Sequence, residues 1–198
     1  MNYAATDVKK LREETGATFN DCKNALAEAG SWAEAVKILE ARSSRKAEKI
    51  MAAGRETKQG GIFAYVHHNN SLGVLLELNC STDFVARSDE FKNLARELTM
   101  QIAGVAPIYI SFEDVPEATL TQLRQEAEND PEVQKRPEKL RAQIVEGKVK
   151  KQLSAQILLE QPWIKDDKIT VGKLVDEVIR KTGENIVVRR FTRYALGE

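Results

Sequence analysis

Residues 62–80 read IFAYVHHNNSLGVLLELNC and are the strongest guide to the fold class of the whole chain. Residues 62–68 and residues 72–80 are rich in β-branched, aromatic and aliphatic side chains, which favour extended strands. Between the two runs, Asn69 and Asn70 are residue types that tolerate the positive φ angles of a tight turn. The pattern therefore predicts a β-hairpin, in which two antiparallel strands are joined by a short loop.

The hairpin is followed by segments with the periodicity of amphipathic helices. Ser88 is a residue type that caps helix N-termini, and one helical face after it is apolar at Phe91, Leu94, Ala95, Leu98 and Ile102. Thr170 can cap a later helix, which Gly183 would end. Both helices have an apolar face that must be buried, so we expect them to pack against the sheet.

The rest of the chain extends this core. Residues 117–157 are expected to be mostly helical, with breaks near Pro131 and Pro137. Residues 186–194 are β-rich and can complete a three-stranded antiparallel sheet. The expected fold class is therefore α+β, with a three-stranded antiparallel sheet packed with helices in residues 61–198.

The N-terminal part, residues 1–53, has the pattern of three short helices. The second and third begin at candidate caps, Thr18 and Ser31, and glycines end the first and the second. Three such helices can form a small independent bundle. After residue 42 we expect the chain to fray from helix into a linker at residues 54–60, which ends in a Gly-Gly pair.

Composition and charge narrow the function classes. With 198 residues, the chain has room for one or two domains with a real hydrophobic core. Its 30 basic and 30 acidic residues cancel, whereas proteins that bind nucleic acids are commonly basic, so we expect a protein partner instead. No apolar run approaches the roughly 18 residues that span a bilayer, and the N-terminus lacks the apolar block of a secretory signal. We therefore expect a cytoplasmic protein with no membrane partner.

Residue types that carry catalysis do not form a recognisable motif. There is no Ser/His/Asp order, no H-E-x-x-H spacing and no Gly-rich phosphate loop. His67 and His68 are adjacent, so on a strand they should point to opposite faces and not chelate one ion. Cys22 and Cys80 form no C-x-x-C pair and are expected in the core of a reduced protein. The sequence thus predicts no enzyme activity, no metal site and no cofactor.

Residues 82–85, Thr-Asp-Phe-Val, join the hairpin to the helix that Ser88 caps. In one interpretation, Phe84 belongs to the hydrophobic core and Asp83 forms the turn. In the other, Phe84 is an exposed aromatic side chain that lies beside an acid and is aimed at a partner. Periodicity does not decide between the two.

Several motifs of this chain resemble those of the elongation factor Ts family. They are, in order, LREETGA (11–17), DCKNAL (21–26) and ELNCSTDFVA (77–86). Shorter similarities follow at GKVKK (147–151), QPWIKD (161–166) and GENIVVRRF (183–191). The resemblance covers nearly the whole chain in the right order, which chance does not readily produce.

The resemblance implies a translation elongation factor that acts as a guanine nucleotide exchange factor and is not an enzyme. Such a factor binds EF-Tu in its GDP-bound and nucleotide-free states, promotes GDP release so that GTP can rebind, and binds no nucleotide itself. The residues implied to act on EF-Tu near its Mg²⁺ are Thr82, Asp83, Phe84 and Val85. The residues implied to anchor EF-Tu from the N-terminal domain, whose fold resembles ubiquitin-associated domains, are Lys9, Arg12, Phe19 and Asn20.

The chain departs from the family pattern in two ways. A Gly-Met-Met run is usual at the positions held here by Thr18, Phe19 and Asn20, so a different contact chemistry is implied there. The chain also resembles the short form of the family, with one core subdomain where longer members have two. Short members can pair, so the resemblance implies a homodimer in which residues 61–198 are also the dimerisation domain. The rival interpretations are a ubiquitin-associated-like adaptor without exchange activity and a small enzyme.

Overall fold

The computed structural model describes residues 3–52 and 56–198, and its first part is a helical bundle. Thr18 caps the second helix, as predicted, because its hydroxyl accepts a hydrogen bond from the Asp21 amide at 3.2 Å. The bundle has an apolar core of its own, made of Val8, Leu11, Cys22, Ala25, Leu26, Ala29, Ala35 and Leu39. The prediction of three N-terminal helices is confirmed, and they are α1 (Ala5–Thr15), α2 (Phe19–Glu28) and α3 (Trp32–Ala52).

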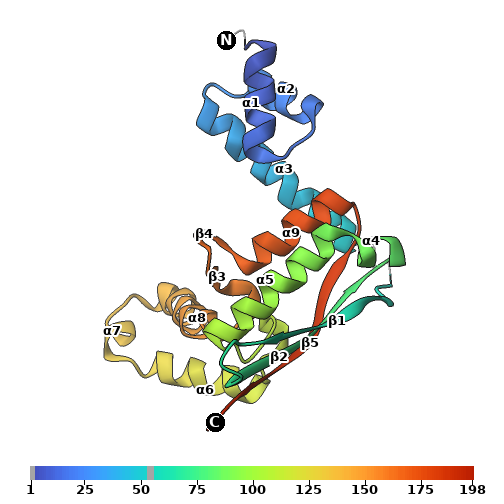
Figure 1. Cartoon of the computed structure of the whole chain (residues 1–198). Helices are drawn as coiled ribbons and strands as arrows, with labels where there is room; N and C mark the ends of the chain where they lie inside the picture. Colours follow the sequence, from blue (N-terminus) through green and yellow to red (C-terminus); the bar gives the residue numbers. More distant parts are fainter. Residues whose placement is uncertain (1–2, 53–55) are drawn as a thin grey trace.

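Helix α3 is longer than the sequence pattern predicts. It runs for 21 residues, from the bundle to the core, where it packs against α9 (Val171–Thr182) (Figure 1). Ile50, near its end, lies against the main hydrophobic core. The third helix was expected to be short, but it continues through the basic residues after position 42 to Ala52, because no glycine or proline interrupts it and the core supports its last turns.

The connection from α3 to the sheet is also shorter than expected. The linker was predicted at residues 54–60. The first strand begins at Gln59, so residues 59 and 60 belong to the strand and not to the linker. Gly60 has a φ angle of 141°, and a Cβ atom there would lie 2.2 Å from the carbonyl oxygen of Leu78. Glycine is therefore required where the first strand approaches the second. Residues 54 and 55 lie outside the described residues, and the domain boundaries stay a prediction.

The sheet has three antiparallel strands in the order β1–β2–β5, as predicted. The first two form the expected hairpin, and Asn70 in its turn has a φ angle of 57°. The last strand pairs with the other side of β2 and places Ile186 opposite Cys80. The strands are β1 (Gln59–Val66), β2 (Leu72–Cys80) and β5 (Ile186–Ala195).

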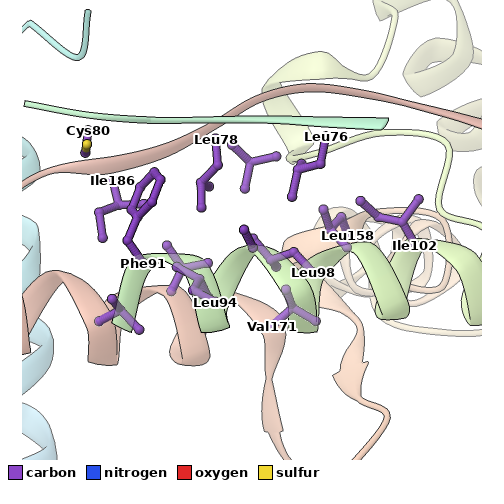
Figure 2. Packing of buried hydrophobic residues seen from close by; sticks show 14 of the residues in the cluster. Leu76, Leu78, Cys80, Phe91, Leu94, Leu98, Ile102, Leu158, Val171 and Ile186 are labelled. Atoms are coloured by element: carbon purple, nitrogen blue, oxygen red, sulfur yellow. The ribbon is translucent and has the colours of Figure 1, made fainter. Parts of the chain in front are cut away.

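Two helices pack on one face of the sheet and enclose the main core. They are α5 (Asp89–Val105) and α9, whose predicted caps, Ser88 and Thr170, accept hydrogen bonds from the amides of Phe91 and Lys173, both at 3.3 Å. Figure 2 shows fully buried side chains of β2 and α5 that point toward one another, among them Leu76, Leu78, Phe91, Leu98 and Ile102. Burial of each contributes about 1.5–3 kcal/mol, so this layer holds the sheet and the helices together.

A second helical group packs around a smaller apolar cluster at one end of the core (Figure 1). Its helices confirm the predicted breaks, since Pro131 begins the second of them and Pro137 precedes the third. A two-stranded ribbon after them was not predicted. The elements of this region are η1 (Phe112–Asp114), α6 (Glu117–Glu128), α7 (Pro131–Gln134), α8 (Glu138–Ser154), η2 (Leu158–Glu160), β3 (Pro162–Trp163) and β4 (Asp166–Thr170).

The other face of the sheet is left open to solvent by the described elements. Near its middle, the Arg190 guanidinium donates to the Glu77 carboxylate at 2.7 Å, and this hydrogen bond lowers the pKa of Glu77. Around this pair the face is apolar, with exposed side chains at Ile62, Val66, Leu75 and Tyr194. We refer to this surface, formed by the outward-facing residues of β1, β2 and β5, as the outer sheet face.

Candidate partner-binding site

The segment between β2 and α5 folds into a five-residue helix, α4 (Asp83–Arg87). Thr82 caps its N-terminus, because its hydroxyl accepts a hydrogen bond from the Val85 amide at 3.3 Å. Ser88 ends α4 and begins α5: its hydroxyl donates to the Val85 carbonyl at 2.8 Å and accepts from the Phe91 amide. The two caps confine α4 to little more than one turn and so define the direction of each side chain on it.

Phe84 and Val85 point in different directions from α4. Val85 is 4% exposed and belongs to the main core, whereas Phe84 is 82% exposed. Successive side chains on a helix are about 100° apart, and α4 is rotated so that Val85 faces the core and Phe84 faces solvent. The interpretation of Phe84 as a core residue is therefore wrong, and its side chain is an exposed aromatic group.

Asp83 lies next to this aromatic group and is also at the surface. Its carboxylate forms an ion pair with Arg87, one turn further along α4. The two side chains are 62% and 77% exposed, and surface pairs of this kind contribute at most about 1 kcal/mol. Asp83 therefore contributes little to the fold, and a partner that offers a better cation or donor can replace Arg87.

Thr82 is itself held by residues from two other places in the fold. Its amide and its hydroxyl donate to the Glu184 carboxylate at 3.1 and 2.8 Å, and its carbonyl oxygen accepts from the Cys80 thiol at 3.1 Å. Burial, and then the nearby Glu184 carboxylate, raise the pKa of Cys80, so the thiol keeps the proton that it donates. Glu184 was not predicted from the sequence as a site residue. Its place in the GENIVVRRF motif is the only feature of the sequence that could have pointed to it.

The four anchor residues expected in the bundle all lie at its surface. Lys9 and Arg12 are on α1, about one turn apart, and Phe19 and Asn20 begin α2. Phe19 is 46% exposed, and the Lys9 ammonium lies 4.0 Å from Glu13 in a largely solvated pair. Figure 1 shows α1 and α2 in the bundle and α4 on the core, with α3 between them. The structure places Thr82, Asp83, Phe84 and Val85 on the core, apart from the bundle residues, so a partner could contact both sets only by spanning them.

His67 and His68 do not point to opposite faces, contrary to expectation. Their ring centroids are 4.3 Å apart, because β1 ends at Val66 and the pair lies in the turn, where strand alternation no longer holds. Among the described residues, no three His, Cys, Asp or Glu side chains gather as they would around a metal ion. In that same part of the chain, no helix has both the length and the apolar composition needed to cross a bilayer.

Comparison with known proteins extends the motif similarity to the whole chain. A family model described as Elongation factor TS matches residues 2–198. The chain is 47% identical to an elongation factor Ts of Coprothermobacter proteolyticus, over all of both chains. It is 50% identical to one of Thermotoga maritima, over all of this chain and 98% of that relative. A chloroplastic elongation factor Ts of Phaeodactylum tricornutum is 44% identical, over 98% of this chain and 96% of its own length.

Proposed function

Since the chain belongs to the elongation factor Ts family, and with it to the translation elongation factors, we propose that it acts as a guanine nucleotide exchange factor. Family membership implies EF-Tu as its partner. In this proposal, the chain binds EF-Tu·GDP, promotes GDP release and leaves EF-Tu free to take up GTP. It forms and breaks no covalent bond, binds no nucleotide or cofactor itself and works in the cytoplasm.

The observation that carries the proposal is the exposure of Phe84 on a helix whose next residue is buried. An aromatic side chain left in water forgoes the roughly 1.5–3 kcal/mol that its burial would contribute, and that free energy becomes available when a partner covers it. Thr82 and Val85 fix α4 to the core, so Phe84 is presented from a rigid support. A group that is already ordered loses little conformational entropy on binding, which favours insertion into a partner.

Exchange also requires that the chain distinguish two states of EF-Tu. Only differential affinity shifts an equilibrium, so it must bind nucleotide-free EF-Tu more tightly than EF-Tu·GDP. To accelerate GDP release by about 10³–10⁵-fold, the chain must lower the activation free energy for release by about 4–7 kcal/mol. Burial of Phe84 in EF-Tu supplies a part of this, and Asp83 can supply more by redirecting polar groups that order the ligands of Mg²⁺. By linkage, GDP then weakens the binding of this chain by the same factor.

A nucleotide release assay tests the proposal directly. EF-Tu loaded with a fluorescent GDP is mixed with an excess of unlabelled GTP, with and without this chain. We expect the chain to speed the fluorescence change by orders of magnitude at substoichiometric amounts, because each copy is released when GTP binds. Release at the intrinsic rate of EF-Tu, at every concentration of the chain, would contradict an exchange function.

The two rival functions explain fewer of the observations. An adaptor that resembles ubiquitin-associated domains would use the bundle but leaves the exposed Phe84 and the Thr82–Glu184 contact without a role. A small enzyme needs convergent polar side chains in a pocket, whereas α4 presents one exposed aromatic side chain and one exposed acidic side chain. Binding of the chain to EF-Tu without any change in GDP release would favour the adaptor.

We further propose that two copies of the chain associate through the outer sheet face. Its apolar side chains come from all three strands, and one of them, Leu75, is 49% exposed on the central strand. Acidic and basic residues are equal in number, so net charge does not oppose self-association. Glu77 and Arg190 lie side by side on this face, and a two-fold axis can place the acid of one copy near the base of the other.

Replacing Leu75 by glutamate is expected to convert the dimer to a monomer, because the variant would bury a charge in the centre of an apolar interface. Light scattering at micromolar concentration measures the mass. The matched control is Leu140→Glu, since Leu140 is 48% exposed but lies on α8, away from the sheet. A wild-type chain whose mass stays that of a monomer as the concentration rises would rule out the dimer.

A further inference from the structure

The position of Glu184 follows from the register of the sheet. Cys80 ends β2 and lies opposite Ile186, the first residue of β5. The residues just beyond these ends, Thr82 and Glu184, therefore face each other although they are 102 positions apart in the sequence. The pairing of β2 and β5 therefore places the Glu184 carboxylate, from the C-terminal part of the chain, at the N-terminus of α4.

Glu184 is held in place by the elements on either side of it. Gly183 ends α9 with a φ angle of 74°, and the Glu184 amide donates to the Thr182 hydroxyl at 3.4 Å. On one side, Ile179 of α9 is fully buried, and on the other Ile186 is 2% exposed. The backbone that carries Glu184 is thus fixed by the main core on both sides.

The contact matters because α4 is too short to be stable by itself. A five-residue helix has no net stability in water, and its first amides have no partner within the helix. Here the Val85 amide donates to the Thr82 hydroxyl, and that hydroxyl donates to Glu184. The Glu184 carboxylate also accepts from the Thr82 amide. Glu184 thus holds both the amide and the hydroxyl of the residue that caps α4.

We propose that Glu184 is a positioning residue for nucleotide exchange: by holding Thr82, it fixes the direction in which α4 presents Phe84 to EF-Tu. The inference rests on the proposed function and extends it to a residue that acts through Phe84 without touching the nucleotide site. Glu184→Ala removes both acceptor oxygens. Glu184→Gln keeps one carbonyl acceptor in the same place and is the conservative variant.

Hydrogen exchange measured by NMR tests the structural half without EF-Tu. In Glu184→Ala, the amides of Val85 and Ala86 should exchange about tenfold faster, whereas amides in the middle of α5 should not change. Glu184→Gln should restore most of the protection. Unchanged exchange of the α4 amides in Glu184→Ala would overturn the inference, because α4 would then be held by other contacts.

A double-mutant cycle tests the functional half. Glu184→Ala should lower the maximal rate of GDP release about tenfold at saturating concentration, with the melting temperature and the half-saturating concentration close to those of the wild type. In the Phe84→Ala background, the same change should have a clearly smaller effect, since only Asp83 is left on α4 for Glu184 to position. Glu160→Ala, at an exposed acid on η2, is the control and should leave the rate unchanged.

Two results separate this inference from the proposed function. Equal effects of Glu184→Ala with and without Phe84, or a wild-type rate in Glu184→Ala, would overturn the positioning role while exchange by the wild-type chain still stands. If the wild-type chain does not speed GDP release, both the function and the positioning role fail. Faster hydrogen exchange in Glu184→Ala would then show only that Glu184 stabilises α4.

Discussion

Replacing Phe84 by alanine is expected to leave the fold intact and to slow GDP release from EF-Tu by about 10–100-fold. The ring is 82% exposed, so its removal leaves no cavity in the core and the melting temperature should stay close to that of the wild type. The rate falls because the variant loses the free energy of burying the ring in EF-Tu, about 1.5–3 kcal/mol. The measurement is release of a fluorescent GDP at saturating concentrations of the chain.

Phe91→Ala is the matched control for Phe84→Ala. Phe91 is fully buried seven positions later, and its ring centroid lies 5.9 Å from that of Phe63. Removal of a buried phenylalanine costs about 3–5 kcal/mol of stability, so this variant should lose stability and activity together. A Phe84→Ala protein that melts normally and exchanges GDP at the wild-type rate would refute the mechanism.

Removing the exposed anchor of the bundle is expected to raise the half-saturating concentration about 10–100-fold and to change the maximal rate little. The variant carries Lys9→Ala, Arg12→Ala and Phe19→Ala together. Contacts that are made equally in the ground state and in the transition state for release add to binding alone. These residues lie in the bundle, away from α4 in Figure 1, so their loss should weaken the complex without altering the action of Phe84.

The control for this variant also removes two cations and one exposed apolar side chain, but from other parts of the surface. It carries Lys92→Ala and Lys150→Ala at exposed cations of α5 and α8, and Ile164→Ala at an apolar side chain that is 49% exposed. It should bind EF-Tu as the wild type does. An equal loss of affinity in both triple variants would mean that the bundle surface is not a specific anchor. A fall in the maximal rate of the Lys9, Arg12 and Phe19 variant, with the half-saturating concentration unchanged, would contradict the assignment of these residues to binding.

Features that depend on neighbours in the sequence could be predicted from it. Thr18, Ser88 and Thr170 cap their helices through an amide three residues later, so the interaction is complete within one turn. The hairpin around Asn70 follows from two β-prone runs and a residue type that accepts a positive φ angle. These local signals were sufficient for the α+β class and the three-stranded sheet, and the motifs were sufficient for the family.

Predictions were wrong where a local signal was weak and a distant contact decided. The basic part of α3 looks like the end of a helix, but packing on α9 carries the helix on to Ala52. His67 and His68 look like strand residues, but β1 ends one residue earlier and the turn brings their rings together. In both cases the local sequence makes the two possible conformations nearly equal in free energy, so the sequence pattern does not choose between them.

The direction of Phe84 was decided by the tertiary structure. Phe84 and Val85 are adjacent and both apolar, so their hydrophobicity does not show which of them is buried. The rotation of α4 about its axis decides it, and that rotation depends on the docking of Val85 against the core and on the hold of Glu184 on Thr82. The second contact joins residues 102 positions apart, which come together because β2 and β5 are paired. The sequence by itself therefore determined the fold class, the family and the segment that carries the site, whereas the side chain that this segment turns toward a partner depends on contacts that exist only after the sheet has formed.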